Sequence, residues 1–406
     1  MTYNNASNGI NNKIGIISFY YNNHNYGGML QAYALCEFLN QSEFNAEQIC
    51  YVRNNKPLEN AKNPTKHDKH KIVKYFNPKN YLRFAKKKLY RFADKYHISN
   101  KPDWKVRIEK FNKFQNSIPH SQEVYYKDTI EQSCKKYDKF IVGSDQVWNM
   151  AWTDDTYFLS FLNDKKRKIS YAASFGNTNF SDEQLKFIKE KLLGFKAISV
   201  REEHSADVLK QILPEKSVEW VLDPTLLLER EDWDKLAAER LIKKKYIVCY
   251  IFGEDDKLRN LVKQFAKDKK IKIVNIAHLY DYRITKSDIG FGDYKFNNIS
   301  PNEFISLIKY SECVFTNSFH ACVFASVYHK NFFVFRRHDL MDMTDRIYSL
   351  CQLFECQDNF CNTDDKCNIE YINKIYQTNN NKELKLFKKM QNKSKTFLIN
   401  SLLGIE

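Results

Sequence analysis

The chain has 406 residues, of which 43% are hydrophobic and 15% aromatic, and its formal net charge is +15. This length suits two folded domains rather than one core, and the hydrophobic content argues against a disordered chain. The sequence has no run of eighteen apolar residues and no signal pattern at its polar N-terminus, so we expect a cytoplasmic protein without a membrane-spanning helix.

The first half of the chain alternates apolar strands with polar turns and helices. Residues 13–20 are mostly β-branched and aromatic and predict a buried strand, which the polar loop 21–28 joins to a helix over 29–39. A later strand begins at 140 and enters a Gly-Ser-Asp turn. The remaining elements of this half are expected as strands at 46–52, 168–175, 197–200 and 218–222 and a helix at 182–193.

The excess of positive charge lies in one segment. Residues 53–113 contain 19 Lys or Arg against five Asp or Glu. Apolar residues recur there at helical intervals, so we expect a basic insertion of amphipathic helices over 53–115. Such a stripe suits nucleic acid, or the acidic lipids and lipid-diphosphate carriers of the inner membrane leaflet. The alternative is a solvated helical insertion that has no partner.

A second alternation of strands and helices follows a charged linker at 229–245. Its elements are expected as strands at 246–252, 271–276 and 312–315, helices at 256–267 and 301–310, and a closing amphipathic helix at 382–403. Two such arrays predict an α/β chain of two Rossmann-like domains facing a cleft. We expect an N-terminal domain at 1–228, a C-terminal domain at 229–375 and a C-terminal helix at 376–406.

The ten cysteines are spread among expected strands and helices, so we expect reduced thiols in the core. The closest group is Cys351, Cys356, Cys361 and Cys367. This group lacks the paired two-residue spacing of a zinc site, and we expect neither a metal nor a resident cofactor.

The most informative stretch is 314–335, which reads as a strand, a polar turn with His320, a helix and another strand. In a parallel sheet this turn lies at the carboxyl end of a strand and the amino end of a helix, where anions bind. A His at that place can move a proton onto a bound anion. The alternative is a helix cap made by Ser318 with a structural His320.

Cations follow the ends of other expected strands. Arg201 lies between an apolar strand and a helix-forming run, where its planar fork suits a carboxylate or phosphate. Pairing of Arg201 with Glu202 or Glu203 is the alternative. Further candidates surround the strand after the His turn, although each can be solvated instead: Lys330, Arg336, Arg337 and Arg346.

Asp145 follows an apolar strand and a Gly-Ser turn, where a carboxylate can accept a proton from a sugar hydroxyl or cap the turn. Trp148 and Tyr26 offer faces to a sugar ring, unless they pack in the core. The remaining candidates for the acceptor side lie in the same polar turns and are Asn25, Gly27, Gly28 and Ser144.

With these motifs in order, the chain resembles the polysaccharide pyruvyl transferase family. The resemblance rests on residues 14–39, 142–149, 170–176, 198–203, 223–225 and 316–320. It implies a fold like that of the GT-B glycosyltransferases, with phosphoenolpyruvate as donor on the C-terminal side and a sugar hydroxyl as acceptor on the N-terminal side. It also implies that His320 is the acid and that Arg201 holds the donor, with Phe319 beside them.

One position departs from the family pattern. Relatives with established activity often have Arg two residues before the His, whereas this chain has Ser318. A serine hydroxyl can bind phosphate but carries no charge. Our hypothesis is that Arg336, Arg337 or Arg346 takes over.

The leading hypothesis is an enzyme that adds pyruvate as a ketal to a sugar of a capsule, O-antigen or exopolysaccharide repeat on a lipid-diphosphate carrier. Residues 53–115 would then dock the enzyme on the inner face of the membrane, and nucleic acid would not be a partner. A glycosyltransferase of the same fold that uses a nucleotide sugar is the first alternative. The second is a non-enzymatic module that binds an anionic lipid carrier or nucleic acid.

Overall fold

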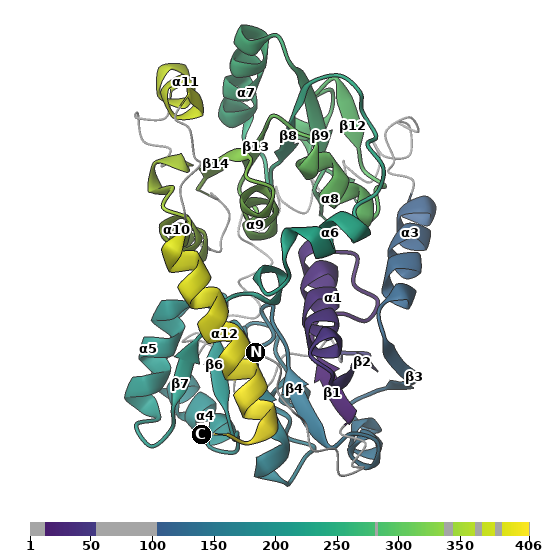
Figure 1. Cartoon of the computed structure of the whole chain (residues 1–406), viewed down its shortest axis with the longest axis vertical. Coiled ribbons are helices and arrows are strands. Elements are labelled where there is room, and N and C mark those ends of the chain that lie inside the picture. Colours follow the sequence, from purple (N-terminus) through teal and green to yellow (C-terminus); the bar gives the residue numbers. More distant parts are fainter. Residues whose placement is uncertain are drawn as a thin grey trace, which may run out of the picture.

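The computed structural model describes residues 13–53, 104–280, 283–336, 344–361, 368–377 and 384–405. Within these ranges the chain forms two parallel sheets, one in each half of the molecule, with helices packed around them (Figure 1). The sequence predicts this α/β arrangement of two strand-and-helix arrays, and the structure confirms it.

The described part of the first sheet has five parallel strands in the order β3-β2-β1-β4-β5. Their bounds are β1 Lys13–Ile17, β2 Asn45–Tyr51, β3 His120–Tyr125, β4 Lys139–Val142 and β5 Lys168–Ser170. A parallel pair, β6 (Ile198–Val200) and β7 (Val218–Trp220), continues this sheet through bridges that join it to β5 and the residues after it.

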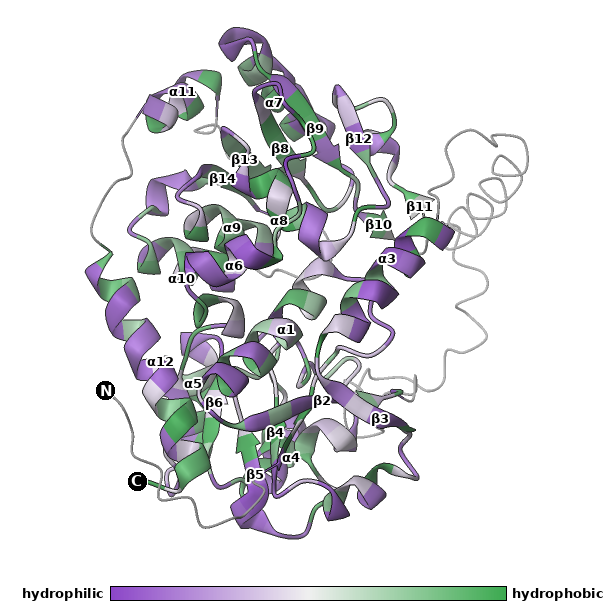
Figure 2. Cartoon of the chain, turned by 45° about the vertical axis from the view of Figure 1, so that its right-hand side comes forward, coloured by the Kyte–Doolittle hydropathy of each residue, from purple (hydrophilic) through white to green (hydrophobic). Residues whose placement is uncertain are grey.

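The described part of the second sheet has six parallel strands in the order β12-β9-β8-β13-β14-β15. Its central strands are buried along their whole length, as expected where helices cover both faces of a parallel sheet. The bounds are β8 Tyr246–Tyr250, β9 Lys272–Ile276, β12 Tyr294–Phe296, β13 Cys313–Thr316, β14 Asn331–Phe335 and β15 Phe360–Cys361. A short hairpin of β10 (Leu279–Tyr280) and β11 (Arg283–Ile284) lies beside β12 (Figure 2).

Helices lie against the sheets and alternate between hydrophobic and hydrophilic residues along their lengths, as expected for helices with one buried face (Figure 2). In the first half they are α1 Tyr26–Gln41, α3 Trp104–Ser117, α4 Asp182–Leu192, α5 Glu203–Ile212 and α6 Arg230–Leu236. In the second half they are α7 Asp256–Lys269, α8 Pro301–Lys309, α9 Phe319–Val327, α10 Thr344–Leu353 and α11 Ile369–Gln377. The described part of the chain contains no helix with the length and hydropathy needed to cross a bilayer.

The first helix begins earlier than the sequence predicts. We expect it over 29–39, but α1 begins at Tyr26, because the side chain of Asn25 accepts a hydrogen bond from the backbone N–H of Gly28. The preceding strand correspondingly ends at Ile17 rather than at residue 20. The loop between β1 and α1 therefore spans residues 18–25, three residues earlier than expected.

The closing helix α12 (Lys385–Leu403) returns to the first half of the molecule, where it runs beside β6 and β7 (Figure 1). The Ser394 hydroxyl oxygen accepts a hydrogen bond of 2.9 Å from the backbone N–H of Leu222, and the Gln391 amide donates one of 2.8 Å to the carbonyl of Leu226. Helix α12 thus packs on the first half of the molecule, beside the end of β7. The expected domain limits at 228 and 375 stay predictions.

Helix α3 joins the two halves. Lys110 pairs with Glu303 of α8 at 2.8 Å, and Arg107 donates to the Tyr26 hydroxyl at 2.6 Å and to the Asn297 carbonyl at 3.3 Å. Most of the basic insertion expected over 53–115, namely 54–103, lies outside the described residues. The part of this insertion from residue 104 onward belongs to α3, which continues to Ser117.

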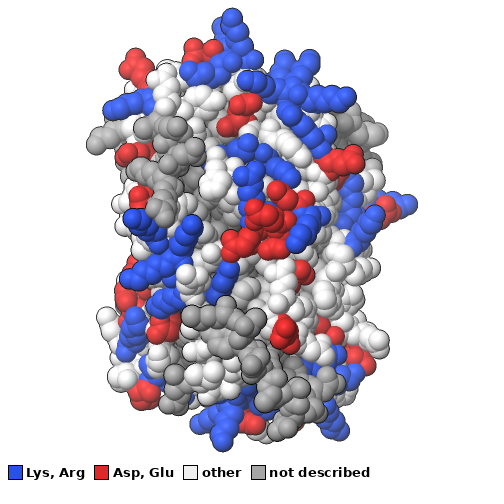
Figure 3. Space-filling view, viewed as in Figure 1, with Lys and Arg blue, Asp and Glu red and all other residues white. Residues whose placement is uncertain are grey.

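The described surface carries charges of both signs (Figure 3). Acidic side chains gather over α6 at the middle of the molecule, with basic ones around them. Several are paired with residues distant in sequence, as with Lys309 and Asp234 at 2.8 Å and with Lys395 and Glu229 at 2.7 Å. Exposed pairs of this kind contribute little stability, on the order of 0–1 kcal/mol each.

Candidate active site

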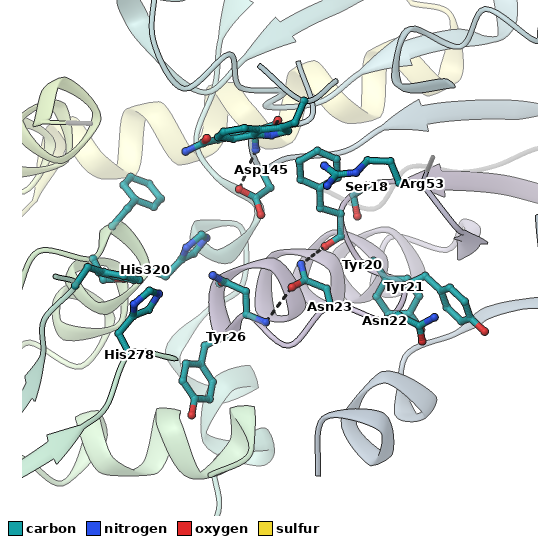
Figure 4. A pocket seen from close by; sticks show the side chains of 18 of the residues that line it. Ser18, Tyr20, Tyr21, Asn22, Asn23, Tyr26, Arg53, Asp145, His278 and His320 are labelled. Atoms are coloured by element: carbon teal, nitrogen blue, oxygen red, sulfur yellow. Dashed lines mark hydrogen bonds between the residues drawn. The ribbon is translucent and has the colours of Figure 1, made fainter. Parts of the chain in front are cut away.

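A pocket of about 830 Å³ lies between the two halves, at the carboxyl ends of their strands (Figure 4). Its walls come from the segments after β1, β2 and β4 in the first half and after β8, β9 and β13 in the second. In doubly wound α/β folds this edge of the sheet is where ligands bind. The lining includes these candidates from the sequence: Asn25, Tyr26, Gly27, Asp145, Ser318, Phe319, His320 and Arg346.

Two helices from opposite halves meet at the pocket with their N-termini. The first turns of α1 and of α9 both contribute to its wall. Ser318 occupies the N-cap position of α9, yet its side chain makes no capping hydrogen bond within the described part of the chain. The capping role considered for Ser318 is therefore wrong. The first-turn N–H groups of both helices give the pocket a partial positive charge.

His320 connects these two helices. Its ring lies so close to the backbone of Gly27 that a Cβ added there would overlap Nδ1 and lie 2.6 Å from Cγ. The His320 side chain is 13% exposed, and its Nε2 is inaccessible to solvent. Gly27 is required at this position because the imidazole of one half rests on the helix terminus of the other. His320 thus faces the pocket beside both helix N-termini (Figure 4).

Asp223 lies behind His320 and is fully buried. Its Oδ2 accepts hydrogen bonds from the Ser144 hydroxyl at 2.9 Å and from Nη1 of Arg201 at 3.0 Å, and it lies 3.7 Å from Nε2 of His320. Its Oδ1 accepts from the backbone N–H and the hydroxyl of Thr225. Burial alone would raise the pKa of Asp223, but the facing His320 and Arg201 hold that pKa well below its usual range.

Arg201 is not where the sequence places it. We expect its guanidinium in the crevice, but its side chain is 2% exposed and does not line the pocket. It pairs with Glu202 at 3.1 Å and with Asp223 at 3.0 Å and lies 4.9 Å from the ring centre of Phe319. Burial would lower the pKa of Arg201, but these carboxylates raise it. Arg201 supports the wall behind Phe319 rather than facing a ligand.

Asp145 lines the pocket from the first half, in the turn after β4. Its backbone has φ of 76°, a left-handed conformation that is unfavourable for most residues and better tolerated by Asp. Its side chain accepts a hydrogen bond of 2.8 Å from the backbone N–H of Gln146, and its carbonyl accepts from the N–H groups of Val147 and Ser174. This strained turn aims a carboxylate at the pocket (Figure 4).

Several other candidates lie away from the pocket. Trp148 is fully buried and stacked on Phe158, so the expected sugar-stacking face is wrong. Ser144 is fully buried against Asp223, and Gly28 turns its backbone N–H to Asn25. None of these three lines the pocket.

Three cations and one aromatic ring complete the account of the expected residues, and of these cations Lys330 does not line the pocket. Arg336 is exposed just after β14 and does not line the pocket. Arg337 lies outside the described residues. The ring of Tyr26 reaches the pocket wall but stacks on Phe304 with centroids 4.6 Å apart, and Arg107 covers its other side at 4.7 Å. The Tyr26 ring is therefore part of the contact between the halves.

Some residues of the pocket were missed in the sequence. Arg53 follows β2 and packs over Phe19 at 5.0 Å. His278 follows β9 and lies against Phe252, with ring centroids 4.1 Å apart. The signal that could have found Arg53 and His278 is the one that found His320: each comes just after the end of a buried parallel strand.

The comparisons with known proteins agree with this arrangement. The UDP-GlcNAc 2-epimerase of Methanocaldococcus jannaschii is 12% identical, with a TM-score of 0.53 over 95% of this chain and 99% of that one. The corresponding enzyme from Rickettsia bellii is 11% identical, with a TM-score of 0.50 over 97% of both chains. An S. aureus MnaA structure with UDP is 10% identical, with a TM-score of 0.51 and 97% coverage of both chains. These similarities confirm the GT-B-like fold and, at such identities, nothing further.

The sequence itself gives the family. A search of curated proteins returns no match. The profile described as polysaccharide pyruvyl transferase matches residues 25–339, from the cap of α1 to just beyond β14. This segment contains most of the residues that line the pocket in both halves, with the exception of residues 18–23 before α1 and Arg346 of α10. The chain therefore belongs to the polysaccharide pyruvyl transferase family.

Proposed function

We propose that this enzyme transfers pyruvate from phosphoenolpyruvate to a pair of hydroxyls on one sugar, forming a cyclic ketal. The observation that carries the proposal is the meeting of the α1 and α9 N-termini at His320, within a pocket that Arg346 also lines. Phosphoenolpyruvate carries a phosphate and a carboxylate. Two helix termini and a guanidinium suit these two anionic groups.

Arg346 is the best replacement for the arginine that stands two residues before the His in characterised relatives. Of the three cations considered for this role, Arg336 does not line the pocket and Arg337 lies outside the described residues. Arg346 lines it, with its guanidinium 5.7 Å from the ring centre of Phe319. It can therefore supply the charge that Ser318 lacks, while the Ser318 hydroxyl donates to phosphate.

The chemistry needs an acid near the methylene carbon of the donor and a base near the acceptor. His320 gives a proton to that carbon, and the first sugar hydroxyl bonds to C2 as Asp145 accepts its proton. The second hydroxyl then displaces phosphate from C2, and its proton leaves with the phosphate. One phosphoenolpyruvate and one diol thus yield one ketal and one inorganic phosphate.

The pocket also has room for the acceptor. Its volume of about 830 Å³ is in the range for drug-sized ligands and exceeds what a three-carbon donor needs. Arg53 and the polar loop after β1 line the side formed by the first half, away from α9. We assign that side to a sugar of a lipid-linked repeat unit for a capsule, O-antigen or exopolysaccharide.

The test is mass spectrometry of lipid-linked glycans incubated with the purified enzyme and phosphoenolpyruvate, with inorganic phosphate assayed in parallel. We expect a pyruvate-sized gain in mass and equimolar phosphate. An H320Q variant is the control for enzyme-dependent transfer. Thermal stabilisation by UDP-sugars, together with no response to phosphoenolpyruvate, would instead support the glycosyltransferase alternative.

A further inference from the structure

The Asp223-Pro224-Thr225 motif has no role in the reaction proposed for this enzyme. Asp223 begins the short helical turn Pro224–Leu226 after β7 and is 1% exposed. Burying a carboxylate destabilises the folded protein unless hydrogen-bond donors surround it. The donors around Asp223 therefore indicate its role. The donors that surround it come from separate segments of the first half.

The two oxygens of Asp223 have different partners. Oδ1 accepts both hydrogen bonds from Thr225, at 3.0 and 2.6 Å, which fixes the carboxylate plane. Oδ2 accepts from Ser144 and Arg201 and turns its remaining side to His320, 3.7 Å away. This separation is that of an ion pair and is longer than a direct hydrogen bond. The carboxylate is thus held rigidly by the first half and aimed at an imidazole of the second.

The two nitrogens of the His320 ring face different groups. Its Nε2 edge faces Asp223, has no accessible surface and has no hydrogen-bond partner among the described residues. The exposed 13% of the side chain therefore belongs to its other atoms. Nδ1 lies on the opposite edge, against the first turn of α1, where Gly27 lines the pocket.

We propose that Asp223 is a positioning residue that keeps the proton of neutral His320 on Nε2 and turns Nδ1 toward the donor. This inference rests on the proposed function for its catalytic meaning. In the reaction, Nδ1 first takes up a second proton from solvent, and the resulting imidazolium gives that proton to the donor, while Nε2–H stays paired with Asp223. A carboxylate that pairs with one imidazole nitrogen fixes the tautomer in this way.

The charges around His320 make such a partner necessary. The N-terminus of α1 faces its Nδ1 edge, and the guanidiniums of Arg201 and Arg346 lie over Phe319, the neighbouring residue. A carboxylate beside the ring offsets this positive charge. Asp145 on the pocket wall and Asp223 behind the ring are the opposing carboxylates. Asp223 is the one that lies within ion-pair distance of the imidazole.

The tautomer can be measured without any donor. In protein labelled with ¹⁵N-histidine, long-range ¹H–¹⁵N spectra identify the protonated ring nitrogen, and the H320Q variant identifies the His320 signals. We expect wild-type His320 to show the Nε2–H pattern at alkaline pH and D223N to show a changed pattern. An Nδ1–H pattern in wild-type protein overturns the proposal, even if D223N does not fold.

Asp288 provides a matched control. Its carboxylate is 1% exposed and pairs with Arg259 at 2.8 Å, and neither of these residues lines the pocket. D288N removes a comparable buried charge, so we expect lower stability with unchanged His320 signals. Identical His320 signals in wild type and D223N would mean that Asp223 is only structural.

Activity gives an independent readout. We expect D223N to lower kcat by about 10²-fold or more, the usual contribution of an acid, with KM for phosphoenolpyruvate changed much less. If phosphoenolpyruvate is not the donor, this assay fails for wild-type enzyme too, whereas the tautomer result stands. Failure of the function and failure of the inference are therefore distinguishable.

Discussion

The imidazole of His320 rests directly on the backbone of Gly27, so a helix of one half supports the proposed acid of the other. A methyl group at Gly27 would occupy the space of the ring. We therefore expect G27A to displace His320 and to lower kcat by about 10²-fold or more. Alanine in a helix normally stabilises relative to glycine, by up to about 1 kcal/mol, so the loss of activity should exceed any loss of stability.

The matched control for G27A is G194A, because a Cβ at Gly194 meets its nearest neighbour at an ordinary 3.7 Å. Steady-state kinetics and urea denaturation of both variants provide the measurement. Full activity in G27A would show that the contact with His320 has no role in the reaction.

Asp145 permits a test that separates its carboxylate from its backbone. Its φ of 76° suits glycine and strains alanine, by about 1–2 kcal/mol. We expect D145G and D145A to lose activity to the same extent, about 10²-fold or more, because both lack the base. D145A should unfold at lower urea concentration than D145G, because both lose the hydrogen bond to Gln146 and only alanine is strained at this φ. Retained activity in D145G would rule out Asp145 as the base.

Arg346 should control donor binding. We expect R346A to raise KM for phosphoenolpyruvate at least about tenfold, corresponding to about 1.4 kcal/mol of lost binding, with R346K in between. R336A removes a cation of the same kind that does not line the pocket, and its KM should change little. Equal KM values in wild type, R346A and R336A would contradict the replacement of the missing arginine by Arg346.

Asp223 should also shape the stability of the protein in acid. Its pKa in the folded state lies well below the value of about 3.9 in an unfolded chain, so its contribution is present above pH 4 and is lost as the pH falls. Each pH unit below that value removes about 1.4 kcal/mol. The difference in the free energy of unfolding between wild type and D223N should therefore shrink from pH 5 to pH 3. Urea denaturation at several pH values measures it, and a constant difference would contradict the depressed pKa.

The basic segment predicts binding to anionic membranes. Its 19 basic residues, at about 1 kcal/mol for each one near an acidic surface, should bind the chain to vesicles containing phosphatidylserine at low salt. Binding should disappear in about 1 M NaCl, where charges are screened beyond about 3 Å. Cosedimentation with anionic and neutral vesicles measures it. Equal binding to both would count against electrostatic docking.

The sequence predicts well which turns come together. In parallel sheets the carboxyl ends of the strands lie at one edge, so apolar strands followed by polar residues locate the pocket from both halves. Asp145 and His320 were found in this way, and both line it. Arg53 and His278 obey the same rule and also line the pocket.

The depth of a side chain is harder to predict. Arg201 also follows a strand, but Asp223 and Glu202 bind its guanidinium below the pocket wall. Trp148 follows the same turn as Asp145, yet it points into the core against Phe158. Both outcomes depend on partners distant in sequence or on the direction of one turn, and local pattern does not contain that information.

Helix α12 has a consequence for folding. Within the described ranges, the polypeptide passes from the first half to the second between β7 and β8, and α12 again packs on the first half. The first half therefore contains residues from before and after the second half in the sequence. Its last helix can pack only after the second half has been synthesised.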